Sequence, residues 1–147
     1  MSFTSFFHLL WNGCSFYEET QDSYPVLHNF KKCEIDLDKQ NIILDIAETE
    51  TEQELGLSFR KKLDRNEGML FLSQNNSPMK FHTKKVHFDI CIVFLDDQNL
   101  VLSTQILRPN DEITTPNHTH SILELSSLYC SSIKKDQLIT LCEGEWD

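Results

Sequence analysis

The longest apolar run of the sequence, Phe88 to Leu95 (FDICIVFL), predicts a strand at the centre of a β-sheet. It is rich in Phe, Ile and Val, and it ends at the polar pair Asp96-Asp97. A second run, Glu67 to Phe71 (EGMLF), places a glycine before uninterrupted apolar residues. Short continuous runs of this composition are typical of strands buried on both faces. We therefore expect these two strands to form the central pair of the fold.

Upstream, apolar and polar residues alternate in a pattern that predicts a β-hairpin. Lys31 to Leu37 (KKCEIDL) and Ile42 to Ala47 (IILDIA) have the composition of strands, and a polar turn separates them. The period changes at Thr49, which is followed three residues later by Glu52. This spacing is that of a capping box, in which the threonine and glutamate side chains satisfy free amides of the first helical turn. We expect a short helix from about Glu50 to Leu57.

The other half of the chain predicts more strands around a long polar loop. Segments with the length and composition of strands are Met79 to Val86, Leu100 to Leu107, Ile122 to Leu125 and Asp136 to Cys142. Arg108 to His120 is polar and contains two prolines, and loops of this length are functional or mobile. Ser126 to Ser132 could form one helical turn. Seven or eight strands with one or two short helices place the protein in the mainly β class, as a β-sandwich or barrel.

Composition and charge restrict the kinds of protein that this chain can be. Its 147 residues are 39% hydrophobic, which is enough for one domain with one core. The net charge of -10 argues against a nucleic-acid binder, which needs a basic surface. The sequence contains no stretch of 18 apolar residues, so we expect no transmembrane helix. We expect residues 33–147 to form a single β-rich domain and residues 1–32 to form an N-terminal appendage.

The N-terminal segment leaves the cellular location open. Residues 3–11 are biased toward apolar side chains, and Gly13-Cys14 follows them, in faint resemblance to a lipoprotein processing site. No Lys or Arg precedes the apolar residues, however, and the segment is as short as a signal core can be. A cytoplasmic and an exported protein therefore both fit the sequence. The aromatic residues of the segment also suggest a surface for a protein partner: Phe3, Phe6, Phe7 and Trp11.

The five cysteines do not form a recognisable pattern. They are odd in number and include no CxxC pair, which argues against a zinc knuckle and against a closed disulfide framework. Cys91 lies inside the longest apolar run, where a cysteine is most simply a small buried apolar residue. We expect reduced, structural cysteines, with Cys14 as the one exception that could have another role.

The middle of the chain resembles domain of unknown function family 192, a family of small conserved bacterial and archaeal proteins. The resemblance covers roughly residues 42–140 and rests on a G-L-x-x-R segment, a G-M-L-F segment and a later V-L-E-L segment. The matching residues are Ala47, Thr49, Glu52, Gly56, Leu57, Arg60, Leu63, Asn66, Glu67, Gly68, Met69, Leu70, Phe71, Phe81, Lys84, Phe94, Asp96 and Ile122 to Leu125. The resemblance implies a mainly β, jelly-roll-like domain without an established activity or cofactor, in a family whose members are often exported.

The polar positions are where this chain departs from the family pattern. Gln53 stands where the family has an Arg, and residues 81–86 (FHTKKV) replace its F-W-M-K-N-T. Cys91 replaces an Asp, and Ser126 to Ser132 replaces the glycines that follow V-L-E-L. The residues of the scaffold are therefore kept, and the polar residues that would line a site are changed.

Basic residues near the shared segments suggest an anion site. On an acidic protein, Arg60 with neighbouring cations could bind an anion in a shallow polar cleft, since its guanidinium makes bidentate contacts. The alternative is an internal salt bridge from Arg60 to Glu52 or Glu67, which would tie the helix to the sheet. The candidate ligand-binding residues are Arg60, His82, Lys84 and Arg108.

Histidine, aspartate and cysteine before and within the central strand suggest a metal site or an enzyme as the alternative. Alternate residues of a strand share a face, so His87, Asp89 and Cys91 would lie together, with His82 opposite. These side chains can bind zinc if the polar loop adds His118 or His120. Cys91 could also be a nucleophile with a neighbouring histidine if its thiol were exposed and its pKa lowered.

Acidic side chains are the last group of candidates. A pair for acid-base chemistry could come from Glu67, Asp89, Asp96 or Glu124, but spacing alone does not pair them. Glu124 is flanked by two leucines and is the best candidate for a half-buried acid and a further partner of Arg60, although the alternation also allows it to be exposed. We expect a non-enzymatic binding module for a small anionic ligand or a protein partner, and the alternative is a small hydrolase-like or metal-binding enzyme. No cofactor is indicated.

Overall fold

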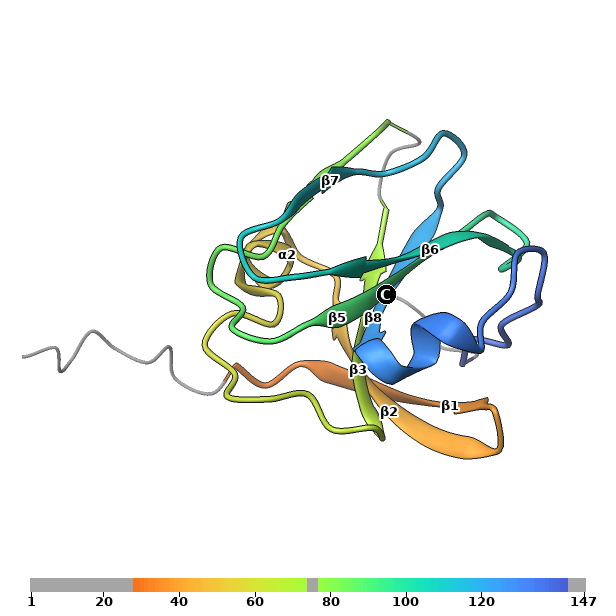
Figure 1. The fold of residues 1–147 in the computed structure, drawn as a ribbon, viewed down its shortest axis with the longest axis horizontal. Helices are drawn as coiled ribbons and strands as arrows, with labels where there is room; N and C mark the ends of the chain where they lie inside the picture. The colour runs from red at the N-terminus through yellow and green to blue at the C-terminus, as the bar shows by residue number, and fades with distance from the viewer. Residues whose placement is uncertain (1–27, 74–76, 143–147) are drawn as a thin grey trace, which may run out of the picture.

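The computed structural model describes residues 28–73 and 77–142, and these residues form a mainly β domain (Figure 1). The expected fold class is confirmed. The strands and helical turns of the described residues are β1 (Lys31–Leu37), β2 (Gln40–Ala47), α2 (Glu50–Leu55), β3 (Glu67–Leu72), β4 (Lys80–His82), β5 (Ile90–Leu95), β6 (Val101–Leu107), β7 (Glu112–Thr114), β8 (Ser121–Ser126) and the 3-10 helix η2 (Ser127–Ser131).

Six of the strands form one open sheet in the order β1-β2-β3-β8-β5-β6, and β4 pairs with β7 in a second sheet of two strands. The β2–β3 pair is parallel, and the other pairs are antiparallel. The large sheet does not close on itself, so the barrel alternative is not realised. None of the helices in the described segments is long and apolar enough to cross a membrane.

The two central strands are buried as expected, but they are not neighbours. All six residues of β5 are buried, and so are the four central residues of β3. β8 lies between them, with Leu123 opposite Leu70 of β3 on one side and Val93 of β5 on the other. The reason is that β8 is also buried along its whole length, so it can occupy the middle of the sheet.

Gly68 allows the centre of the sheet to close. A Cβ atom on Gly68 would lie 2.7 Å from Leu125 Cδ2 and 2.8 Å from Leu44 Cδ2. The leucines of the two neighbouring strands therefore fill the space that a side chain would need. This close approach explains why a glycine begins the apolar run of β3.

The capping box at Thr49 is confirmed. Thr49 Oγ1 accepts from the Glu52 amide at 3.2 Å, and Glu52 Oε2 accepts from the Thr49 amide at 3.0 Å. Partial burial raises the pKa of Glu52, but the hydrogen bonds from the Thr49 amide and from His28 outweigh it and lower the pKa from 4.5 to about 2. Glu52 therefore stabilises the fold above pH 4.5, and this contribution is lost between pH 4.5 and 2. The helix ends at Leu55, before Gly56, which has a φ of 47°.

Three expected elements were wrong in extent or type. The strand expected over residues 79–86 is limited to β4, and the polar loop over residues 108–120 contains β7, its partner. The expected strand over residues 136–142 is absent, and a single bridge joins Leu138 to Leu100 there. The polar strands β4 and β7 pair with each other away from the main sheet, and this pairing is not visible in the local pattern of either segment.

The large sheet carries a separate core on each face. Cys33, Cys91 and Leu123 belong to one core, against which η2 packs, and we call this side the disulfide face. Met69, Phe71 and Ile122 belong to the other, and we call this side the cavity face. In Figure 1, α2 and β7 lie at the upper left of the sheet, and η2 lies at the lower right.

Two disulfides hold the disulfide face, which corrects the expectation of reduced cysteines. Cys91 of β5 is bonded to Cys130 of η2, and Cys33 of β1 is bonded to Cys142. The Cα atoms of the two pairs are 5.3 Å and 5.9 Å apart, within the usual range for a disulfide. The partners are 39 and 109 residues apart in the sequence, so the pairing depends on the fold. Cys14 lies outside the described residues.

Removing the Cys91–Cys130 disulfide should destabilise the protein. A bond that closes a loop of 39 residues restricts the unfolded chain, so the double variant Cys91→Ala/Cys130→Ala should lose roughly 3–4 kcal/mol of unfolding free energy. Chemical denaturation measures this loss, and Cys14→Ala serves as the control. In denaturant without reductant, only one of the five cysteines, Cys14, should react with a thiol reagent, because the other four are bonded in disulfides. Reaction of all five would show that the disulfides do not form.

Candidate functional site

Two acidic side chains lie in one row across the cavity face of the sheet. Asp45 of β2 is opposite Met69 of β3, and Met69 is opposite Glu124 of β8. Neighbouring strands are about 4.8 Å apart, so the backbones of Asp45 and Glu124 are separated by roughly 10 Å. Both residues are buried, with exposed fractions of 8% and 6%. The sheet therefore places two carboxyl groups in a layer that is otherwise largely apolar.

Asp45 is paired on both of its oxygens. Lys32 Nζ lies 2.5 Å from Oδ1, and an Arg60 Nη atom lies 2.6 Å from Oδ2. The Arg60 guanidinium also lies over the Phe30 ring, 5.9 Å from its centroid. Arg60 forms an internal salt bridge, as expected, but its partner is Asp45 and neither Glu52 nor Glu67. The sequence could not indicate Asp45, because the loop after α2 decides which strand Arg60 reaches.

Glu124 has no such partner. No hydrogen bond or ion pair joins its carboxyl group to another described residue. Burial raises the pKa of Glu124 to about 8, although the positive charge of Arg60 opposes part of this effect. The group is therefore mostly protonated at neutral pH. Buried polar side chains in folded proteins nearly always have a partner, so an unpaired one needs an explanation.

Glu124 lines a cavity of about 280 Å³ between α2 and β4. Leu57, Phe71 and Val86 are buried residues of its wall. Phe81 packs edge to face on Phe71, with the ring centroids 5.2 Å apart and the planes at 89°. The buried residues of the wall are thus apolar except for Glu124. Four exposed, ionisable side chains also line it: Glu50, Glu54, Lys80 and His82.

Gln53 holds α2 in place beside the cavity. Its side-chain amide donates to the carbonyl of Ala47 at 3.3 Å and to the carbonyl of Leu72 at 3.0 Å. These carbonyls lie at the ends of the neighbouring strands β2 and β3, so one side chain fixes the helix to both strands. Gln53 was noted in the sequence only as a departure from a family pattern.

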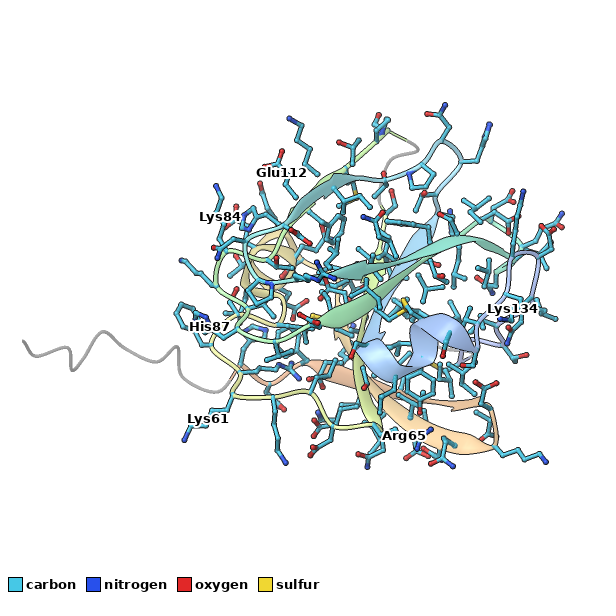
Figure 2. The ribbon with its side chains drawn as sticks, viewed as in Figure 1. Lys61, Arg65, Lys84, His87, Glu112 and Lys134 are labelled. Carbon is cyan, nitrogen blue, oxygen red and sulfur yellow. A yellow bond between two sulfur atoms is a disulfide. The ribbon has the colours of Figure 1, made fainter. Side chains whose placement is uncertain are left out.

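The four residues expected to bind an anion do not share one cavity. His82 lines the cavity of Glu124, whereas Arg60 lines a neighbouring cavity of about 610 Å³. Lys84 and Arg108 are exposed and line neither cavity. Thr83 brings these two close along the backbone, because its hydroxyl donates to the Arg108 carbonyl at 2.5 Å. Figure 2 shows Lys84 at the outer edge of the molecule, pointing away from the sheet.

Cys91 can serve neither as a metal ligand nor as a nucleophile in this structure. Its sulfur is bonded to Cys130 and the residue is fully buried, so the thiolate that both alternatives need is absent. In residues 28–73 and 77–142, no three His, Cys, Asp or Glu side chains are grouped to hold a metal ion. β5 begins at Ile90, so His87 and Asp89 precede the strand. The alternation of side chains in a strand therefore gives no reason for these two residues to share a face with Cys91. The other histidines and the aspartate of that set are exposed: His87, Asp89, His118 and His120. Figure 2 shows His87 at the periphery.

Glu124 differs from the other three candidate acids because it is buried and has no hydrogen-bond partner among the described residues. Asp96 caps the β5–β6 turn by accepting from the amides of Gln98 and Leu100, each at 2.9 Å. Glu67 accepts from the Asp64 amide at 3.1 Å, and Asp89 is exposed. The flanking leucines were the signal that identified Glu124 as a candidate for burial. Its lack of a partner follows from the packing of the sheet, which the sequence pattern does not show.

Comparison with known proteins gives a family and two similar folds. The sequence model of domain of unknown function family 192, described as an uncharacterised ACR, matches residues 33–140. No curated protein matches the chain. A proposed transcription regulator from Sinorhizobium meliloti 1021 is similar in structure, with a TM-score of 0.69 and 14% identity over 79% of this chain and 98% of that chain. A protein of unknown function from Novosphingobium aromaticivorans DSM 12444 has a TM-score of 0.64 and 19% identity over 83% of this chain and 96% of that chain. At these identities the likeness establishes the fold.

The burial of Glu124 predicts a specific dependence of stability on pH. Between pH 4.5 and 8 the folded protein keeps a proton on Glu124 that the unfolded chain has lost, so stability should fall as the pH rises. The variant Glu124→Gln, which resembles the protonated form, should lack this fall. The difference in unfolding free energy between Glu124→Gln and the native protein should grow by up to roughly 1.4 kcal/mol per pH unit in this range.

Urea denaturation at several pH values measures this difference. The exposed Glu112→Gln on β7 is the control, and it should run parallel to the native protein. Glu52 does not interfere, because its contribution changes below pH 4.5. A constant difference between Glu124→Gln and the native protein from pH 4.5 to 8 would contradict the prediction.

Proposed function

Since the chain belongs to domain of unknown function family 192, a family without an assigned activity, we propose a function from the geometry of its cavity. The domain is a non-enzymatic binding module that takes a small ligand into the cavity between α2 and β4. Glu124 is the polar anchor of the ligand, and Leu57, Phe71 and Val86 pack against its apolar part. Compared with the cleft expected from the sequence, this proposal keeps His82 and moves the centre of the site to Glu124.

The observation that carries the proposal is the unpaired carboxyl group in the wall of a cavity. An isolated buried carboxyl lowers the stability of the fold relative to a well-packed apolar residue. Asp45, in the same row of the sheet, shows how this protein pairs an acid that serves structure. Binding sites characteristically combine an apolar cavity with a few polar groups that fix the ligand. A ligand would supply the partner that Glu124 lacks.

The surroundings of Glu124 favour binding over catalysis. A nucleophilic mechanism needs an activated nucleophile, and a carboxyl group that keeps its proton is a poor one. The other ionisable side chains that line this cavity are exposed at its rim, and none of them contacts Glu124 in a hydrogen bond. One buried acid in an apolar wall suffices to recognise a ligand.

A screen of small fragments by amide NMR tests the proposal. Fragments with a short apolar part and one polar group, whether cationic, neutral or anionic, should shift the amide signals of Gly56, Phe71 and Val86. At least one class should bind with a Kd in the millimolar range or below, as is usual for fragments of a few atoms. The variant Val86→Phe should abolish these shifts by filling the cavity.

The control is Leu138→Phe, because Leu138 is 61% exposed and lies outside the lining of the cavity. The dispersion of the amide spectrum reports whether each variant is folded. If Val86→Phe does not fold, Glu124→Gln takes its place, and it should change which fragments bind. Absence of binding across all three fragment classes, or unchanged shifts in a folded Val86→Phe, would overturn the proposal.

A further inference from the structure

We infer that the ligand group bound beside Glu124 is an alkylammonium, that is, a protonated amine on a short apolar chain. The inference rests on the proposed function and names its class of ligand. Three features of the cavity carry it: an unpartnered carboxyl group, a pair of aromatic rings in the wall, and two further carboxylates at the rim. Each favours a cation over an anion of the same size.

The carboxyl group of Glu124 is a free acceptor in the wall of a partly open cavity. The side chain is 6% exposed and lines the cavity, and no described residue donates to it. Among residues 28–73 and 77–142, Arg60 is the positive charge that acts appreciably on Glu124, and its guanidinium is already bonded to Asp45 at 2.6 Å. An ammonium group has three donors and a full charge, so it can supply the ion pair and the hydrogen bonds that the fold does not.

The aromatic wall suits the same group. Phe71 and Phe81 both line the cavity, and their rings pack edge to face. The face of an aromatic ring attracts an ammonium within about 6 Å of its centroid, and this attraction increases when water is excluded. Leu57 and Val86 provide apolar contact for the methylene groups of the chain. Aromatic residues in the wall of a site therefore favour a cation over an anion.

The charged groups at the rim add to the preference for a cation. Glu50 and Glu54 are one turn apart on α2, so they lie on the same side of the helix, and both line the cavity. Lys80 and His82 of β4 also line the cavity. With Glu124, the lining has three carboxyl groups against one lysine and one histidine. The protein as a whole has a net charge of -10, which further favours the approach of a cation.

Binding of this group involves a proton. In the free protein the carboxyl group of Glu124 holds a proton at neutral pH, since burial raises its pKa to about 8. When the ammonium enters, the O–H bond of the carboxyl group breaks, its proton passes to the buffer, and the resulting carboxylate pairs with the ammonium. The ligand keeps its own protons and charge. Affinity should therefore increase with pH, by up to about tenfold per unit below pH 8.

The volume of the cavity limits the ligand. The cavity of about 280 Å³ is slightly smaller than the pockets of about 300–1,000 Å³ that hold drug-sized molecules, so it suits a smaller ligand. A butylammonium ion and the side chain of a lysine are both small enough. The shared chemistry is the alkylammonium, and its source is either a free amine or a lysine of a polypeptide.

Isothermal titration calorimetry with matched probes tests the inference. The probes are n-butylammonium chloride, sodium butyrate, n-butanol and the methylamide of Nα-acetyl-lysine, each at pH 7 in phosphate and in MOPS buffer, neither of which is a primary amine. Butylammonium should bind more tightly than butyrate and butanol. Its apparent enthalpy should differ between the buffers by the amount expected for proton release. Glu124→Gln should weaken butylammonium by about tenfold or more and abolish the release, because a buried ion pair is lost.

Variants at the rim separate the roles of the carboxyl groups. The double variant Glu50→Gln/Glu54→Gln should weaken butylammonium only a few-fold, and added salt should reduce this effect. The exposed Glu112→Gln should leave the affinity unchanged. Tighter binding of the lysine derivative than of butylammonium would assign the site to a polypeptide lysine, and the reverse order would assign it to a free amine.

The inference and the proposed function can fail separately. If butyrate or butanol binds more tightly than butylammonium, or if Glu124→Gln binds butylammonium as well as the native protein does, the ammonium inference is overturned while the binding module stands. If these probes and the fragments of all three classes fail to bind, the proposed function itself is overturned.

Discussion

The arrangement of the sheet depends on β8, which is paired on both sides and buried along its length. A central strand of this kind is normally apolar on both faces, because the layers that cover it exclude water. Glu124 departs from this rule at the middle of the strand. The carboxyl group of Glu124 lies beside a cavity and stays protonated, because burial raises its pKa. The charge of Arg60 lowers this pKa in part, but Arg60 forms no ion pair with Glu124. The burial of one acid thus links the order of the strands to the cavity.

The two faces of the sheet have different roles. On the disulfide face, two covalent bonds hold β1, β5, η2 and the segment up to Cys142 around a continuous apolar core. On the cavity face, the described residues form no disulfide, and the cover consists of α2, the loops and the small β4–β7 sheet. The disulfides restrict the unfolded chain and so add to the stability that both apolar cores provide. The covalent bonds lie on one face, and the unpaired polar group lies on the other.

How far the sequence predicted the structure depends on how local each feature is. The β1–β2 hairpin and the capping box at Thr49 were predicted correctly, because neighbouring residues determine each of them. The order of the central strands was wrong, because β8 is inserted between two strands that precede it in the chain. The disulfides were missed for the same reason. Pairings over 39 and 109 residues have no local signal, and five cysteines did not suggest a closed set.

The site was predicted in part. Glu124 was identified as an acid suited to burial by its two leucine neighbours, and His82, a predicted ligand-binding residue, lines the cavity. Arg60 was correctly expected to form an ion pair, but its partner depends on a loop whose path the sequence pattern does not give. His87 and Asp89 were expected to share a face with Cys91 because they were assigned to the same strand, but the strand begins after them, at Ile90. The difference between Asp45 and Glu124 arises only from three-dimensional packing.

The most direct measurement of the central claim is the pKa of Glu124 in the folded protein without ligand. The chemical shift of its side-chain carboxyl carbon, followed by carbon-detected NMR from pH 4 to 9 and assigned with Glu124→Gln, reports this value for a single residue. A midpoint near 8 is predicted, because the carboxyl group is buried without a partner. A midpoint near the ordinary value of 4.5 would mean that Glu124 is solvated or paired, and it would contradict the account of the cavity.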